Sequence, residues 1–339
     1  MENYATFLQT ALDFTDRENA LNIAKKAVDG NTDFVGAGTP LIKALGMNLI
    51  KEIKKENPGK LIVVDLKPMD IGKLEMNIAI DAGADIVIIP GIAPLSTIEE
   101  CIETAKKADI KIYVDKIGMK DSLGQNIMSE HLNIIKEKCR DVLVETFPEN
   151  TLKVHGHEFK KEGGKILSEL KKLYPNKVIV ADLKTISDAD KEFESAFTAG
   201  ADIACIIAAT ADDQIRKAVA VAKQHKKRVM ADLIGLRDYL GEGGLIKRAK
   251  EVEFLGVDFV CYHISIDDQL RGKEVPPESI RNIKEELLIP VVAIGGINIQ
   301  SAHNIAKAGA HVVIVGRAIT KADDPTEATK KIKEKINSI

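Results

Sequence analysis

Val178-Ile-Val-Ala-Asp-Leu-Lys184 is the stretch that decides the fold of this 339-residue chain. Its β-branched and aliphatic residues follow one another almost without interruption, which is typical of a parallel strand buried on both faces. Similar apolar runs recur along the chain, with amphipathic segments between them. The predicted strands are Ala11–Phe14, Phe34–Gly38, Leu61–Lys67, Ile86–Pro90, Ile110–Ile117, Val142–Phe147, Val178–Lys184, Ile203–Ala208, Val229–Ile234, Phe259–Ile264, Val291–Ile297 and Val312–Ile319.

Strands that alternate with amphipathic helices predict βα units and a parallel sheet. The sequence supplies about twelve strands, and since eight strands close a barrel, about four are left over. The expected fold is therefore α/β: a (β/α)8 TIM barrel with an additional, partial (β/α) barrel copy.

The surplus strands belong to an internal repeat. Asp65-Leu-Lys67 recurs as Asp182-Leu-Lys184, and Ala82-Gly-Ala-Asp85 recurs as Ala199-Gly-Ala-Asp202, in both cases 117 positions later. The segment that starts at Ile117 recurs at the same spacing from Ile234. One gap-free offset across several βα units indicates a duplication.

The repeat predicts two units, a partial copy at 1–147 and a catalytic barrel copy at 148–339. Two glycine-rich strand ends, Gly295-Gly296 and Gly316-Arg317, have no counterpart in the first copy. The irregular segment Phe147–His157 is the expected junction. A second division stays open, in which the strands from about residue 110 onward complete the barrel.

Composition argues against several classes of function. A net charge of −3 and an aromatic content of 4% give neither a basic surface nor stacking platforms for nucleic acid. No apolar run approaches the roughly 18 residues of a membrane span, and no signal peptide is recognised at the start. The four cysteines are widely spaced and are expected to be reduced, which predicts a cytoplasmic location.

Two charged residues end the strand quoted first. Asp182 and Lys184 are two positions apart, so on a strand they point to the same side, near the end where barrel enzymes place their sites. The carboxylate keeps the lysine protonated. Such a pair can bind a metal ion or stabilise an enediolate by its charge, and a purely structural ion pair is the alternative.

Further polar residues and glycines end neighbouring strands. His263 is a candidate general acid or base, and Asp232 ends the preceding strand at the same mouth. The last two strands end in the phosphate-site candidates Gly295, Gly296, Gly316 and Arg317. Glycines let backbone amides approach an anion closely, and a guanidinium suits phosphate. The alternative is two tight turns with a surface arginine.

Five segments of the second copy resemble the suprafamily of orotidine 5′-monophosphate decarboxylase, most closely its 3-hexulose-6-phosphate synthase branch. They are Val180-Ala-Asp-Leu-Lys-Thr185, Ala231-Asp-Leu-Ile-Gly235, Tyr262-His-Ile-Ser-Ile-Asp-Asp-Gln269, Val292-Ala-Ile-Gly-Gly-Ile297 and Ile314-Val-Gly-Arg-Ala-Ile319. Residues 1–145 resemble an extra copy of the family's first half, through Thr39-Pro40-Leu41-Ile42 and Asp65-Leu-Lys-Pro-Met-Asp70.

The resemblance implies an aldehyde-lyase that condenses formaldehyde with ribulose 5-phosphate, or runs in reverse. It implies Mg²⁺ or Mn²⁺ as the ion that holds the enediolate oxygens. The implied roles are Asp182 and Lys184 as the catalytic core with Asp182 near the metal, His263 as acid/base, Asp232 as a substrate contact, and Gly296, Gly316 and Arg317 as phosphate ligands.

The resemblance also implies a pairing of barrels. Family members form dimers in which the last Asp of a D-x-K-x-x-D signature reaches into the partner's site. Here the second copy has Ser187 at that place, whereas the first copy keeps Asp70. We therefore expect Asp70 to enter the C-terminal site, either within one chain as a pseudo-dimer or between the chains of a homodimer. The alternative is that Asp70 pairs only locally with Lys67. Gly36 stands where the family usually has a metal-binding Glu, and Glu145 is the candidate second metal ligand.

Three functions remain open at this point. A phosphosugar aldolase fits best, because His263 is followed by Asp-Asp-Gln and because Gly-Gly replaces the Pro-Gly that is usual in orotidylate enzymes. A decarboxylase of the same suprafamily, acting on orotidine 5′-monophosphate or a keto-gulonate phosphate, is the alternative. A non-catalytic phosphosugar-binding protein is the third, which Ser187 favours and the retained Asp182, Lys184 and His263 oppose.

Overall fold

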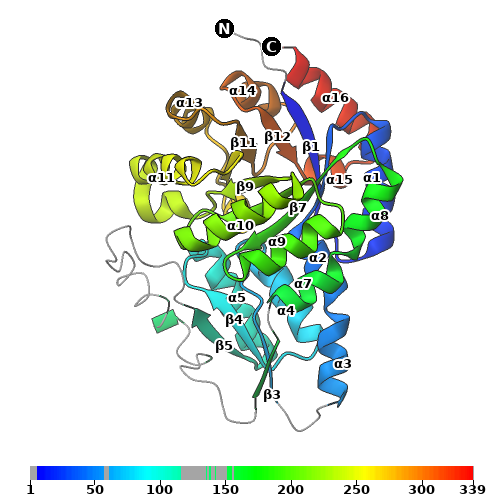
Figure 1. Ribbon diagram of the computed structural model, residues 1–339, viewed down its shortest axis with the longest axis vertical. Coiled ribbons are helices and arrows are strands. Elements are labelled where there is room, and N and C mark those ends of the chain that lie inside the picture. The colour runs from blue at the N-terminus through cyan, green and yellow to red at the C-terminus, as the bar shows by residue number, and fades with distance from the viewer. Residues whose placement is uncertain are drawn as a thin grey trace.

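Eight parallel strands close a barrel, as the sequence predicts. The computed structural model describes residues 6–56, 61–115, 135, 137–138, 142, 151–154 and 156–338. The barrel order is β1-β12-β11-β10-β9-β8-β7-β2, and the barrel forms the upper part of the molecule in Figure 1. Its strands are β1 (Phe7–Leu12), β2 (Phe34–Ala37), β7 (Val178–Thr185), β8 (Ile203–Ile207), β9 (Arg228–Asp232), β10 (Phe259–His263), β11 (Val291–Ile294) and β12 (Val312–Val315).

Helices cover the outside of the barrel, so its strands are buried on both faces. The barrel interior is filled by β-branched and sulfur-containing side chains such as Val180, Cys205 and Met230. The outer core lies between the strands and the helices. The helices of this half are α1 (Arg17–Asp29), α8 (Lys165–Leu173), α9 (Ala189–Thr198), α10 (Asp212–His225), α11 (Leu236–Phe254), α12 (Ile266–Leu270), α13 (Pro277–Glu286), α14 (Ser301–Lys307), α15 (Arg317–Thr320) and α16 (Pro325–Asn337).

Aspartates that precede strands help to fix the register of the sheet. Asp202 Oδ2 accepts the N–H of Ile179 on the neighbouring strand at 2.9 Å. Asp85, its counterpart in the repeat, accepts the N–H of Ile62 in the same way at 2.7 Å. The repeated Ala-Gly-Ala-Asp sequence therefore encodes the end of a helix and the alignment of the strand that follows.

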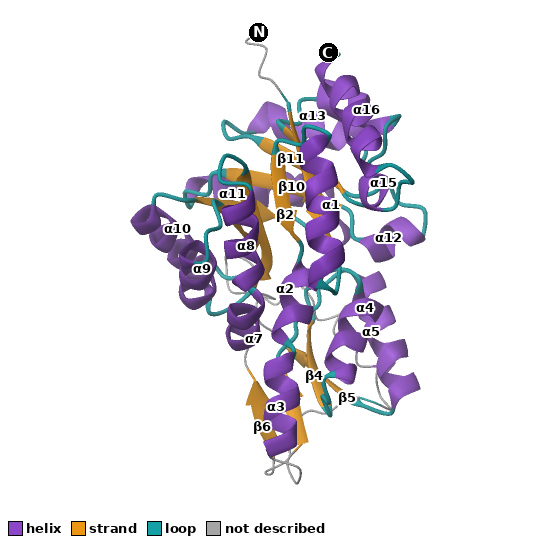
Figure 2. Cartoon of the chain, turned by 90° about the vertical axis from the view of Figure 1, so that its right-hand side faces the viewer, coloured by secondary structure: helices purple, strands orange, loops and turns teal. Residues whose placement is uncertain are grey.

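A second, four-stranded parallel sheet packs against the end of the barrel at which the strands terminate. Its order is β5-β4-β3-β6, with β3 (Leu61–Val64), β4 (Ile86–Pro90), β5 (Lys111–Asp115) and β6 (Thr151–Val154). Ile186, Ile207 and Ile234, which follow or end barrel strands, belong to its hydrophobic core. Figure 2 shows this unit below the barrel, with α2 (Thr39–Gly46), α3 (Asn48–Glu56), α4 (Gly72–Asp81), α5 (Leu95–Ala108) and α7 (Gly156–Gly163).

The two copies exchange strands. In the repeat, Phe34 corresponds to Thr151 and Leu61 corresponds to Val178, 117 positions later. Phe34 pairs with Val178, and Leu61 pairs with Thr151, so β2 and β6 each join the sheet of the other copy. The helices that follow these strands, α2 and α7, cross so closely that a Cβ on Gly163 would meet the backbone of Ile42.

This exchange corrects the predicted division at 147/148. Strands β1 and β2 lie in the segment that was assigned to the partial copy, yet they close the complete barrel. The second division is also wrong, because β5 lies in the smaller sheet. The sequence could not distinguish the pairings, since both copies offer the same apolar strand pattern to either partner.

Two strand predictions need correction as well. The first strand begins at Phe7 and ends at Leu12, rather than spanning Ala11–Phe14. β6 lies at Thr151–Val154, in the segment predicted to be an irregular junction. The predicted strand Val142–Phe147 lies outside the described residues except for its first residue.

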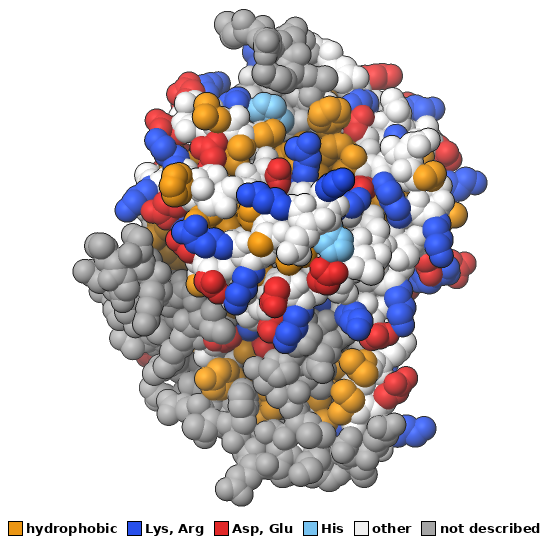
Figure 3. Space-filling view, in the orientation of Figure 1, with side chains coloured by type: hydrophobic (Ala, Val, Ile, Leu, Met, Phe, Trp, Pro, Cys, Tyr) orange, Lys and Arg blue, Asp and Glu red, His pale blue; other side chains and the backbone are white. Residues whose placement is uncertain are grey.

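The described surface carries charges of both signs (Figure 3), and the described cysteines lie in the interior. On the described part of the face in Figure 3, acidic and basic side chains are interspersed. Cys101, Cys205 and Cys261 are free and buried. Within the described ranges, no helix is both long and apolar enough to cross a membrane.

Candidate active site

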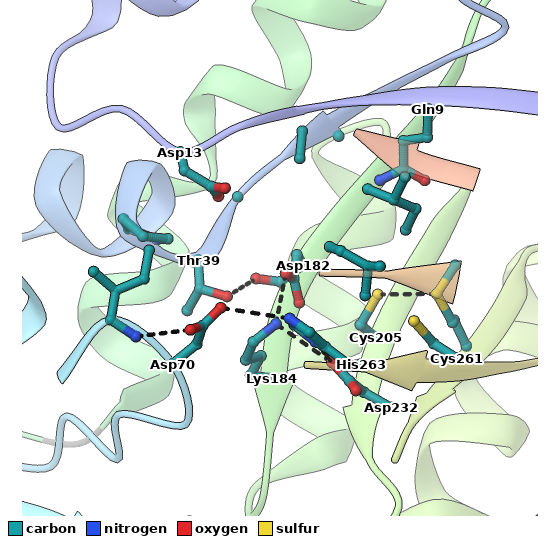
Figure 4. A pocket seen from close by; sticks show the side chains of 18 of the residues that line it. Gln9, Asp13, Thr39, Asp70, Asp182, Lys184, Cys205, Asp232, Cys261 and His263 are labelled. Atoms are coloured by element: carbon teal, nitrogen blue, oxygen red, sulfur yellow. Dashed lines mark hydrogen bonds and ion pairs between the residues drawn. The ribbon is translucent and has the colours of Figure 1, made fainter. Parts of the chain in front are cut away.

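The charged residues predicted from four separate segments line one cavity at the C-terminal end of the barrel strands. Asp182 and Lys184 come from β7, Asp232 ends β9 and His263 ends β10. Figure 4 shows them together with Asp70, which comes from the smaller unit. The prediction that these residues meet is therefore confirmed.

Lys184 is buried and held as a cation by carboxylates. Its Nζ lies 2.7 Å from Asp182 Oδ2 and 3.4 Å from Asp232 Oδ2. Burial alone would lower its pKa, but Asp182, Asp232 and Asp70 raise the pKa well above the ordinary lysine value. The site therefore contains a fixed positive charge at neutral pH.

His263 is held between two carboxylates. Nδ1 lies 2.8 Å from Asp232 Oδ2, and Nε2 lies 3.5 Å from Asp70 Oδ2. Burial and Lys184 lower the pKa of His263, but the charge of Asp232 and the hydrogen bonds to Asp232 and Asp70 raise it to about 9. The pKa of Asp232, which burial would raise, falls to about 2 because of His263 and Lys184. At neutral pH the pair is an imidazolium and a carboxylate.

Asp70 enters this site within one chain. It precedes α4 of the smaller unit, and Oδ1 accepts the N–H of Ile266 on the barrel side at 2.5 Å. Burial would raise the pKa of Asp70, but His263 and Lys184 lower it. The direct polar neighbours of Asp70 are the N–H groups of Ile266 and Ile71 and the His263 ring. Lys184 influences Asp70 through its charge.

The phosphate-site candidates line a second cavity, the outer cavity, which adjoins the inner cavity that contains Lys184 and Asp182. Gly295, Gly296, Gly316 and Arg317 surround it, and Asp13, Asp70 and His263 line both cavities. Gly295 has φ 123°, and a Cβ there would lie 2.6 Å from the carbonyl oxygen of Ile264, so only glycine fits between the two strand ends. Arg317 Nη2 donates to Gln269 Oε1 at 2.7 Å, which orients the exposed guanidinium.

Asp13 is a residue of the site that the sequence patterns do not predict. Asp13 directly follows β1 and lines both cavities. Burial, together with the charges of Asp70 and Asp182, raises its pKa to about 7, although Lys184 and His263 act in the opposite direction. A polar residue directly after a barrel strand was the available signal, but the assignment of residues 1–147 to the partial copy placed Asp13 outside the complete barrel.

The described residues offer only part of a metal site. Asp182 Oδ1 and Gln9 Oε1 are buried oxygen atoms that have no hydrogen-bond partner among the described residues, and both residues line the inner cavity. Oxygen atoms of this kind suit Mg²⁺. Gly36, the barrel residue at the expected second ligand position, has no donor side chain, and Gln9 occupies the space beside it. Glu145 lies outside the described residues. No group of three His, Cys, Asp or Glu side chains in the described part of the chain is placed to hold a metal ion.

Known proteins share both the sequence pattern and the fold. A family profile described as the orotidine 5′-phosphate decarboxylase / HUMPS family matches residues 6–145 and, a second time, residues 129–332. The 3-hexulose-6-phosphate synthase of Mycobacterium gastri is 34% identical over 176 residues, which are 52% of this chain and 81% of that protein. The bifunctional enzyme Fae/Hps of Methanoculleus marisnigri is 42% identical over 115 residues, which are 34% of this chain and 29% of that protein.

A solved structure extends the likeness over nearly the whole chain. The 3-keto-L-gulonate-6-phosphate decarboxylase of Vibrio cholerae aligns with a TM-score of 0.56 and 17% identity, over 98% of each chain. At this identity the likeness concerns the fold.

Proposed function

Because the chain belongs to the orotidine 5′-phosphate decarboxylase / HUMPS family, we propose that it is a phosphosugar aldolase that joins formaldehyde to ribulose 5-phosphate or catalyses the reverse cleavage. One observation carries the proposal: the His263 ring lies between Asp232 and Asp70, next to the ammonium group of Lys184. An acid/base group beside a fixed positive charge is what enediolate chemistry needs.

The sugar phosphate would bind in the outer cavity. Backbone amides of the glycine loops and the Arg317 guanidinium would hold the phosphate there. Because the two cavities share Asp13, Asp70 and His263, a sugar bound by its phosphate can place its other end in the inner cavity. Binding energy from the phosphate would thus orient the reacting carbon.

Two groups have pKa values suited to the proton transfers. Asp13, with a pKa of about 7, would take the proton from C1 of ribulose 5-phosphate and leave the electron pair in an enediolate. The C1 electron pair then attacks formaldehyde, and the imidazolium of His263 gives its proton to the new alkoxide oxygen. The substrates lose one proton at C1 and gain one at the alkoxide oxygen, so the reaction is balanced. Exchange of a proton with water would then return Asp13 and His263 to their starting protonation states, and cleavage would reverse both transfers.

Positive charge would stabilise the enediolate oxygens. Lys184 supplies one charge without a change of protonation, because its pKa lies well above neutrality. We include Mg²⁺ or Mn²⁺ in the proposal, held by Asp182 through its unpartnered Oδ1, with Gln9 Oε1 as a further oxygen atom beside the site. The ion would add electrostatic stabilisation to the same oxygens.

A decarboxylase of the same family is the second candidate. Asp13, Asp70 and Asp182 are close enough that the latter two raise the pKa of Asp13. Crowded carboxylates would also destabilise a substrate carboxylate, which favours loss of CO₂. A non-catalytic phosphosugar-binding protein is the third candidate.

Turnover of defined substrates tests the proposal. Purified protein is incubated with ribulose 5-phosphate, formaldehyde and Mg²⁺, and separately with orotidine 5′-monophosphate and with 3-keto-gulonate 6-phosphate. We expect formaldehyde to be consumed in the first mixture and the activity to be lost in Lys184→Ala. Release of CO₂ in either of the others, without formaldehyde consumption, would favour the decarboxylase, and phosphosugar binding without turnover would favour the binding protein.

A further inference from the structure

Two helices meet at their N-termini beside the site, and each receives a carboxylate from the other's segment. Asp70, just before α4, accepts the N–H of Ile266, the first residue of α12. Asp267 in α12 accepts the N–H of Gly72, the first residue of α4, at 2.9 Å through Oδ2. This reciprocal capping joins the segment that carries Asp70 to the segment that carries His263.

The Asp267 carboxylate is buried and accepts a second hydrogen bond, unlike a capping carboxylate on the surface. The same Oδ2 atom accepts a hydrogen bond from Thr97 Oγ1 of α5 at 2.8 Å. Asp267 is 4% exposed and Thr97 is fully buried. The carboxylate therefore bridges α4 and α5 of the smaller unit from α12 of the barrel.

The residue between Asp70 and Gly72 is held in an unfavourable conformation. Ile71 has φ 50° and ψ 52°, in the left-handed region that β-branched residues rarely adopt. Such a conformation persists only where the surroundings enforce it. The hydrogen bond from Gly72 N to Asp267 holds the peptide between Ile71 and Gly72. It therefore helps to enforce the turn that directs Asp70 toward His263.

In the second copy, the corresponding backbone N–H group is capped by a side chain of the same copy. The counterparts of Ile71, Gly72 and Thr97 in the repeat are Asp188, Ala189 and Gln214. Gln214 Oε1 accepts the N–H of Ala189 directly, at 3.1 Å. In the first copy the shorter Thr97 reaches Gly72 only through Asp267, so the cap comes from the loop of His263.

We propose that Asp267 is a positioning residue that holds the Ile71 turn and thereby keeps the Asp70 carboxylate against His263. The proposal deepens the proposed function, since the kinetic role of Asp70 rests on it. The position of Asp70 can, however, be read without any substrate, through the His263 ring. The charged and titratable groups that act on this ring are Asp232, Asp70 and Lys184, together with Asp13, which lines the same two cavities.

The first measurement is the titration of His263 by NMR in the full chain without substrate. Asp70→Asn should lower the pKa of His263, because a carboxylate partner is lost. Asp267→Ala should lower it in the same direction, and the double variant should be close to Asp70→Asn alone. Asp16→Ala, which removes an exposed cap from α1 (Asn19 N to Asp16 Oδ1, 2.9 Å), is the matched control and should leave the titration unchanged.

The second measurement is a rescue. Thr97→Gln in the Asp267→Ala background would offer Gly72 the local amide cap that Gln214 gives Ala189. It should restore the His263 titration toward that of the wild type, and where turnover is measurable it should recover most of a roughly tenfold or larger loss of kcat.

Two outcomes would overturn the proposal: a wild-type His263 titration in folded Asp267→Ala, or a further full-sized shift when Asp267→Ala is added to Asp70→Asn. In kinetics, additive losses would have the same meaning, because residues that act through one another are non-additive. If no substrate is turned over, the proposed function fails but the titration still decides the role of Asp267.

Discussion

Lys67 Nζ donates a hydrogen bond to Ser187 Oγ at 2.8 Å, across the contact between the smaller sheet and the barrel. Lys67 is the counterpart of Lys184 in the repeat, and Ser187 is the counterpart of Asp70. Each copy therefore extends its signature residue toward the sheet of the other copy. The Asp70 carboxylate reaches the complete barrel. Ser187 reaches the unit of the four-stranded sheet, whose sequence copy has no counterpart of the glycine loops at 295–296 and 316–317.

This asymmetry predicts unequal effects of substitution. Asp70→Asn should lower kcat by about 10² or more, because a charged neighbour of His263 and Lys184 is neutralised. Ser187→Ala should stay close to the wild-type rate, since Ser187 contacts only the smaller unit's lysine among its described polar partners. Steady-state kinetics on both variants, with folding checked by circular dichroism, measures the difference. Near-wild-type activity in both would contradict a role for Asp70.

Arg317 should contribute mainly to substrate binding. Arg317→Ala should raise KM for a phosphorylated substrate by the equivalent of about 2–4 kcal/mol, since a charge-assisted contact is lost. Arg281→Ala removes an exposed arginine whose partner is Glu278 on the same helix, and it should leave KM unchanged. Unchanged KM and kcat in Arg317→Ala would place the phosphate elsewhere.

The titration of His263 should make stability depend on pH. Its pKa is raised from 6.5 to about 9, so its contribution is complete below pH 6.5 and is lost as the pH rises through 9. The full loss is up to about 3 kcal/mol for a shift of this size. The titration of Asp13 affects stability at lower pH. Because its pKa is raised from 3.8 to about 7, the free energy of unfolding falls as the pH rises from about 4 to 7.

Urea unfolding at pH 6.5, 8 and 9.5 measures this effect. The wild-type free energy of unfolding should fall across the series. In His263→Gln the fall should be much smaller, even if the absolute stability is lower because Asp232 loses its partner. An equal fall in both proteins would assign the titration to other groups.

Much of the site could be predicted because parallel barrel strands present their C-terminal ends at one mouth. Asp182, Lys184, Asp232 and His263 were found from that rule alone. The origin of β1 and β2 could not be predicted, because a duplicated strand pattern fits either sheet equally well. Asp13 was therefore missed although it follows a barrel strand. The role of Asp267 could not be predicted from the sequence, since its bond to Gly72 joins residues 195 positions apart.

Metal dependence should separate the two catalytic candidates. If the aldolase proposal holds, EDTA should abolish formaldehyde consumption, and Mg²⁺ or Mn²⁺ should restore it. Asp182→Asn should raise the Mg²⁺ concentration required, because a charged oxygen ligand is lost. Full activity on orotidine 5′-monophosphate in EDTA would indicate a metal-free decarboxylase instead.

The last prediction concerns complementation between chains. In a dimer that exchanges the signature Asp, one variant lacking the Asp and another lacking the Lys can together form one intact site. Here Asp70 and Lys184 line the same cavity of a single chain, because the N-terminus of α4 packs against the segment that follows the same chain's β10. Inactive Asp70→Asn and Lys184→Ala chains, unfolded together in urea and refolded as a mixture, should therefore recover no more activity than the two proteins refolded apart. Co-refolding matters because it lets strands and helices pair with either chain. The control is wild-type protein refolded under the same conditions, which must regain its activity. A clear gain of activity in the mixture of variants would mean that Asp70 is supplied by a second copy of the chain.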